Sequence, residues 1–94
     1  MFLGKRIKEL REEKELLQRQ LSAELEIDTP MYSKLERGER KAKREQVIKM
    51  AKLFEVEEEG LLSLWLAGQV YEIIKNESEA LKALKIVEQS VEKK

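Results

Sequence analysis

The sequence contains no cysteine and no histidine. Without cysteine the chain can form no disulfide, no iron–sulfur cluster and no thiolate zinc site. Histidine is the commonest general base and metal ligand in proteins, so its absence removes the usual centre of catalytic or metal chemistry. No loop carries the alternating Asp and Asn positions around a central glycine that a calcium site needs. We therefore expect no metal, no cofactor and no enzymatic activity.

Glycine, proline and long apolar runs are also scarce. The 94 residues include 4 glycines and 1 proline, whereas Lys, Glu and Leu are abundant, which favours helices. No apolar run approaches the roughly 20 residues of a membrane span, and the first residues lack the apolar core of a secretory signal. We expect a small all-α protein that lies in the cytoplasm and does not contact a membrane.

The net charge is zero, but the charges are unevenly distributed. Residues 1–54 hold 14 basic and 10 acidic residues, a net +4, and residues 55–94 hold 5 and 9, a net −4. The window 34–52 holds 8 basic and 3 acidic residues, a net +5. This asymmetry is expected when one face meets phosphate and another meets protein, although an uneven solvated surface gives the same counts.

Apolar residues recur at helical spacing in four segments of the N-terminal half. The predicted helices cover residues 3–14, 18–26, 29–37 and 44–55. Asp28 can cap the third helix, Pro30 suits its first turn, and Gly38 supplies a left-handed stop. The second and third helices therefore meet at a tight corner, which leaves the outer face of the third free to enter a groove on a partner.

The C-terminal third has more apolar surface than one partner helix can cover. Residues 61–74 are apolar on nearly all sides, and a final helix at 77–92 carries an apolar seam with 4-3-4 spacing. We expect these helices to pack in a homodimer, with folding back inside one chain as the alternative. The expected interface residues are Leu64, Trp65, Tyr71, Ile74, Leu81, Leu84, Val87 and Val91.

Four motifs occur in a characteristic order: Leu17-Gln18, then Leu21 to Ile27, then Leu35-Glu36-Arg37-Gly38, then Met50 to Val56. Over about residues 3–62 this arrangement resembles the Cro/repressor-type helix-turn-helix family, the XRE-like transcriptional regulators. The resemblance implies a lambda-repressor-like five-helix DNA-binding domain at residues 1–62. It does not cover the last third of the chain, where the apolar pattern predicts a C-terminal helical extension at 63–94 that dimerises.

The resemblance also implies roles for individual residues. Gln18 would bond a phosphate and brace the recognition helix, or be an ordinary helix-start residue. Thr29, Pro30, Ser33 and Lys34 hold outward positions of that helix and would approach base edges, although Thr29 and Pro30 can instead serve only the helix start. The loop residues that would contact phosphates are Arg37, Arg40, Lys41, Lys43 and Arg44. Arg11 and Glu36 match a structural ion pair of the family.

Several positions depart from the family pattern. Glu15 stands at a usual glycine, Leu17 at a usual threonine, and Glu26 at the corner glycine, where we expect a positive φ. Tyr32 replaces an aliphatic residue. Its ring either lies in the core with the hydroxyl at the rim or leans toward the sugar–phosphate backbone.

These features predict a sequence-specific transcriptional regulator that binds double-stranded DNA. It would act as a repressor and bind a palindromic operator as a homodimer, with the third helix in the major groove. The alternative is an antitoxin-like interaction module that holds a partner protein through its C-terminal helices.

Overall fold

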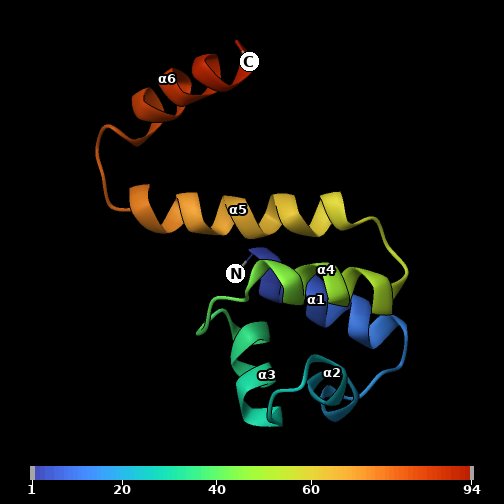
Figure 1. Ribbon diagram of the computed structural model, residues 1–94. Coiled ribbons are helices and arrows are strands. Elements are labelled where there is room, and N and C mark those ends of the chain that lie inside the picture. Colours follow the sequence, from blue (N-terminus) through green and yellow to red (C-terminus); the bar gives the residue numbers. More distant parts are fainter. Residues whose placement is uncertain (1, 94) are drawn as a thin grey trace.

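The computed structural model describes residues 2–93, and within them it contains six α-helices and no strand (Figure 1). The helices are α1 (Phe2–Glu13), α2 (Gln18–Leu25), α3 (Thr29–Arg37), α4 (Arg44–Phe54), α5 (Glu58–Ile74) and α6 (Ala80–Glu92). The predicted all-α fold is confirmed. The last helix begins at Ala80 and not at residue 77, because residues 77–79 form turns in which the Ala80 N–H donates to the Glu77 carbonyl (3.3 Å). None of the helices in the described residues is long and apolar enough to cross a membrane.

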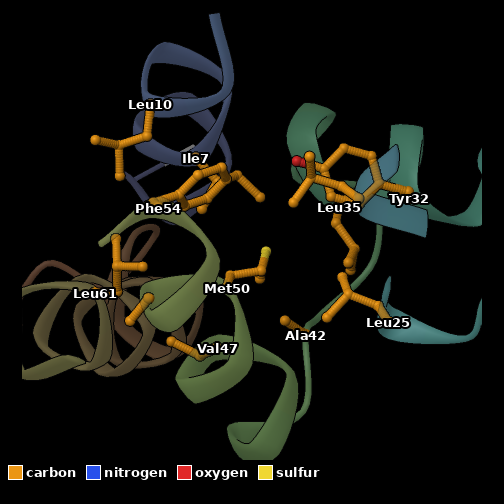
Figure 2. Close-up of a cluster of buried hydrophobic side chains, with 12 residues drawn as sticks. Ile7, Leu10, Leu25, Tyr32, Leu35, Ala42, Val47, Met50, Phe54 and Leu61 are labelled. Atoms are coloured by element: carbon orange, nitrogen blue, oxygen red, sulfur yellow. The ribbon is translucent and has the colours of Figure 1, made fainter. Parts of the chain in front are cut away.

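Helices α1 to α5 enclose one hydrophobic core, in which α1 packs against α3, α4 and α5, and α2 packs against α3 and α4. Met50 lies near the middle of the buried cluster in Figure 2. The core residues come from all five helices and from the loop before α4: Ile7, Leu10, Leu21, Leu25, Tyr32, Leu35, Ala42, Val47, Met50, Ala51, Phe54 and Leu61.

Local chemistry at the helix ends explains the short loops. The Asp28 carboxylate accepts from the Met31 N–H (2.7 Å), and Gly38 ends α3 with φ 73°, as predicted. Leu17 cannot cap α2 with its side chain, but the Gln20 side chain accepts from the Leu17 backbone N–H (2.7 Å). This bond is one half of a capping box, and the other half, in which a threonine hydroxyl would accept a backbone N–H of the first turn, is missing.

Three glutamates hold left-handed backbone conformations: Glu15 (φ 56°), Glu26 (φ 58°) and Glu55 (φ 57°). The positive φ expected at Glu26 is confirmed, while Glu15 and Glu55 were not expected to share it. A side chain with a Cβ is strained there, because Cβ approaches the following carbonyl oxygen. Glycine would relieve that strain at each of the three positions.

Replacing Glu26 by glycine is therefore expected to raise the free energy of unfolding by about 0.5–1 kcal/mol, since the corner is strained with any side chain. Urea denaturation monitored by circular dichroism measures the change. Glu24→Gly is the matched control, because Glu24 is exposed inside α2 and glycine there should lower stability by about 1 kcal/mol. Two variants that are destabilised equally would contradict this account of the corner.

Tyr32 is fully buried, with 0% of its surface exposed, and its ring lies in the core away from solvent. Its hydroxyl lies close to Glu36 without forming a hydrogen bond of normal geometry. Burial raises the pKa of Tyr32 far above its usual value, and the nearby Glu36 carboxylate raises that pKa further. The tyrosine is therefore a core residue and does not lean toward solvent or a partner.

The last two helices bury fewer residues than each of the first four. Helix α5 covers α1 and α4, but Leu61 is its only fully buried residue. Helix α6 has no buried residue and stands apart from the bundle in Figure 1. The predicted boundary at residue 62 lies inside α5, so a separate C-terminal unit remains a prediction.

Candidate nucleic-acid interface

The corner between α2 and α3 is held by two small hydroxyl side chains. Ser22 is buried, and its Oγ donates to the Arg19 carbonyl (3.0 Å). Because that proton is used, the Thr29 hydroxyl is the donor in the 3.1 Å contact between Thr29 Oγ1 and Ser22 Oγ. Thr29 is half-buried, and its hydroxyl joins α2 to α3 at the start of α3. This arrangement corresponds to the alternative in which Thr29 serves the start of the helix.

A nearly buried ion pair ties α1 to the end of α3. Arg11 Nε lies 2.6 Å from Glu36 Oε2, Arg11 Nη2 lies 3.2 Å from Glu36 Oε1, and the two side chains are 13% and 3% exposed. Arg11 also donates from Nη1 to the Leu16 carbonyl (2.9 Å). The bidentate geometry fixes the angle between the two helices as well as their distance.

The ion pair controls the ionisation of both groups. Burial acts to raise the pKa of Glu36, but the hydrogen bonds from Arg11, the nearby Tyr32 hydroxyl and the hydrogen bond from Gln18 together outweigh it and hold that pKa below its ordinary value. The hydrogen bond to Glu36 raises the pKa of Arg11, against a smaller opposing effect of burial. Both side chains are therefore charged at neutral pH.

Gln18 connects α2 to the same carboxylate. Its Nε2 donates to Glu36 Oε1 (3.0 Å), so residues of α1, α2 and α3 meet at one group. An amide carries two N–H donors, and Gln18 is only half-buried. One donor therefore braces α3, and the second can be offered to an acceptor outside the protein.

The outer side of α3 carries Pro30 and Lys34, which are both exposed. Ser33 is half-buried and accepts a hydrogen bond from Arg37 Nη1. Arg37 also pairs with Glu39, with Nε 2.7 Å from Oε2. The hydrogen bond between them lowers the pKa of Glu39 and raises that of Arg37. This exposed pair is a weak contact that an incoming phosphate can displace.

The loop before α4 is held by α5. The Trp65 indole Nε1 donates to the Ala42 carbonyl (2.7 Å), and the Arg44 guanidinium lies 5.0 Å from the centre of the indole ring. Lys41 Nζ donates to Gln69 Oε1 (3.1 Å). Trp65 and Gln69 therefore position a segment whose cations are exposed: Arg40, Lys41, Lys43 and Arg44.

A family model described as helix-turn-helix matches residues 7–61, which is more than half of the chain. The chain belongs to the XRE-type helix-turn-helix family. It is a DNA-binding helix-turn-helix regulator. No curated protein and no solved structure matches it. The match begins within α1, covers α2, α3 and α4, and ends at the first turns of α5.

Two further cations, Lys5 and Lys8, lie beside α3, the second helix of the helix-turn-helix unit. The sequence alone did not single them out. A depression of about 520 Å³ between α1 and α3 is lined by Lys5, Lys8, Arg11, Gln18, Ser33, Glu36 and Arg37. Lys5 and Lys8 are exposed, and sequence periodicity assigns them only to a solvated face. The sequence did carry one signal for these two cations. Lys5, Lys8 and Arg11 follow one another at intervals of three residues, and residues at that spacing are neighbours on a helix surface.

The structure therefore distributes the proposed DNA contacts of this regulator over three places. Pro30, Ser33 and Lys34 lie on α3 itself, and Gln18 lies at the start of α2 beside the depression. Arg40, Lys41 and Lys43 lie in the loop that Trp65 holds, and Arg44 begins α4. Trp65, which the sequence predicts at an interface between two copies, is partly buried and packs against the core cluster.

Proposed function

We propose that this regulator binds a specific sequence of double-stranded DNA by placing α3 in the major groove. The observation that carries the proposal is the exposed side of α3 beside a segment of exposed cations, in a helix-turn-helix whose recognition helix is fixed by Arg11 and Glu36. A helix fits the major groove of B-DNA, and flanking cations meet the phosphates on both sides.

Within this proposal the contacts have different roles. Lys34 and Ser33 read base edges, while Pro30 and the Thr29 methyl make van der Waals contacts. Gln18, Arg37, Arg40, Lys41, Lys43 and Arg44 contact phosphates, which position the protein and carry no sequence information. Lys5 and Lys8 extend the same positive surface along α1.

The regulator would act as a homodimer. Two copies of α3 would enter successive major grooves about 34 Å apart on a palindromic operator. Residues 1–62 would form the DNA-binding domain, and residues 63–94 would set the spacing between the two copies. Repression in the cytoplasm would follow from occupying a promoter.

The joint substitution Lys34→Ala and Arg40→Ala is expected to weaken DNA binding roughly 10- to 100-fold. It removes one proposed base contact and one phosphate contact, and both side chains are exposed, so the fold is unaffected. Electrophoretic mobility shifts on an operator selected from random DNA measure the affinity. The slope of log K against log salt should flatten by about one to two units.

Lys82→Ala together with Lys85→Ala is the matched control for charge. Both lysines are exposed on α6, away from the helix-turn-helix, and their removal also changes the net charge by two. The control should bind the operator as the unchanged protein does. Unchanged affinity in the Lys34 and Arg40 variant would mean that DNA binds another face.

A second candidate is an antitoxin-like module that holds a partner protein through α5 and α6, with DNA binding secondary. The exposed apolar surface of these two helices favours it. Purification of the tagged protein from its native cells, followed by identification of a stoichiometric partner, tests it. A clean homodimer that buries this surface would count against the second candidate.

A further inference from the structure

Eight of the ten exposed large hydrophobic side chains of the described residues lie on α5 and α6. Those on α5 are Leu66, Val70, Tyr71 and Ile73, and those on α6 are Leu81, Ile86, Val87 and Val91. Phe2 extends the same area, because its ring packs edge-to-face on Tyr71 with 5.6 Å between centroids. A concentration of this kind on two adjacent helices marks an interaction surface.

Helix α5 has two apolar faces. Leu61 and Trp65 lie on the face that covers the core. Leu66, Val70 and Ile73 follow a spacing of four and three residues on another side, and Ile73 is 77% exposed. No charged residue occurs between Leu61 and Tyr71, so this outer face gives a partner helix an uninterrupted apolar stripe.

Helix α6 carries a matching stripe that its own chain leaves open. Ala80, Leu84, Val87 and Val91 lie on one side, where Ala80 and Leu84 are half-buried and Val87 and Val91 are exposed. Within residues 2–93, α6 packs extensively against no other helix. Figure 1 shows α6 set apart from α5 after the connecting turns. An isolated helix of 13 residues is marginal in water, where helices shorter than about 12–15 residues are barely stable. A packing partner is therefore needed to keep α6 folded.

We infer that α6 of a second copy packs on the outer face of α5, and that by two-fold symmetry the two copies exchange their last helices. This deepens the proposed homodimer and rests on it. The exchange covers both open stripes with the same contact made twice, which is the requirement of a two-fold interface. Neither stripe needs an unidentified protein to complete it.

Length and exposure fit this occupant. At about 1.5 Å per residue, the 13 residues of α6 span about 20 Å, close to the length of the uncharged outer stripe of α5. The exposed hydrophobic side chains on the two stripes are Leu66, Val70 and Ile73 on α5 and Val87 and Val91 on α6, and each is 42–77% exposed. Two-fold exchange covers these side chains at two contacts, and both contacts count toward the roughly 800 Å² per partner of a stable interface.

The absence of cysteine makes thiol crosslinking a direct test. Two full-length variants, Val70→Cys on α5 and Val87→Cys on α6, are mixed, unfolded and refolded together, and treated with a short bis-maleimide. The expected product is a crosslinked dimer containing one copy of each variant, identified by mass spectrometry. In a single chain carrying both substitutions, the crosslink should join two chains.

Lys82→Cys replaces Val87→Cys in the matched control, because Lys82 lies on the opposite side of α6 from its apolar stripe. That control should crosslink at most one tenth as much. A crosslink closed within one chain, a monomer in sedimentation equilibrium, or equal crosslinking of the control would overturn the exchange. A monomer that binds the operator would leave the DNA-binding proposal standing, whereas a crosslinked dimer that does not bind DNA would overturn that proposal alone.

Discussion

Replacing Glu36 by glutamine is expected to lower the free energy of unfolding by about 3 kcal/mol, because it leaves Arg11 as a nearly buried charge without its partner. The Glu36 carboxylate accepts two hydrogen bonds from Arg11 and one from Gln18. A glutamine has one acceptor oxygen where the carboxylate has two. Its amide N–H groups are donors, so they cannot pair with the N–H donors of Arg11 or Gln18. Part of this network must therefore be left unpaired in the variant.

The loss should depend on pH in a defined direction. The pKa of Glu36 lies below the ordinary value of 4.5 in the folded protein, so the folded state prefers the charged carboxylate. The stabilisation is fully present above pH 4.5 and is lost as the pH falls through the folded value. The unchanged protein and Glu36→Gln should therefore differ most at neutral pH and converge in acid.

Thermal melting and urea denaturation at several pH values measure both effects. Glu39→Gln is the matched control, because Glu39 pairs with Arg37 on the exposed surface and its loss should leave the melting midpoint nearly unchanged. An unchanged midpoint in Glu36→Gln at neutral pH would show that the ion pair does not anchor α3. If the stability difference between the unchanged protein and Glu36→Gln stayed constant into acid, the loss would come from altered packing and not from the lost charge.

The sequence predicted those parts of the fold that depend on local chemistry. Asp28 and Gly38 bound α3 because one accepts a backbone N–H and the other adopts a positive φ, and both preferences are properties of single residues. The bounds of α1 to α4 agree to within one residue with the predicted segments. Apolar residues that recur at helical spacing in these segments, such as Leu21, Leu25 and Leu35, lie in the core.

The contacts that position the candidate site depend on distant parts of the chain. Trp65 reaches the Ala42 carbonyl across 23 residues, and no periodicity signals a hydrogen bond of that kind. The Thr29 hydroxyl could have faced DNA or the protein, and only the position of Ser22 decides between them. Lys5 and Lys8 join the basic surface because α1 crosses beside α3, which is a property of the assembled bundle.

Gly4 allows that crossing, and replacing it by alanine is expected to destabilise the protein by about 3 kcal/mol. A Cβ at this position would overlap the backbone carbonyl oxygen of Glu36 and lie 2.8 Å from that of Leu35. These atoms belong to the backbone of α3 and cannot rotate away, so the two helices must separate. Separation also strains the pair of Arg11 and Glu36 nearby, and urea denaturation measures the combined loss.

Gly68→Ala is the control for helix propensity, because Gly68 lies within α5 and a Cβ there would meet only the Phe2 ring, at 3.9 Å. Alanine should raise the free energy of unfolding by about 1 kcal/mol at such a site. The opposite signs of the two substitutions separate close packing from propensity. If Gly4→Ala were as stable as Gly68→Ala, α1 could not lie so close to α3, and Lys5 and Lys8 would lose their place beside the recognition helix. A strongly destabilised Gly4→Ala would instead show that the position of the proposed DNA-binding face depends on the absence of a side chain at Gly4 of α1.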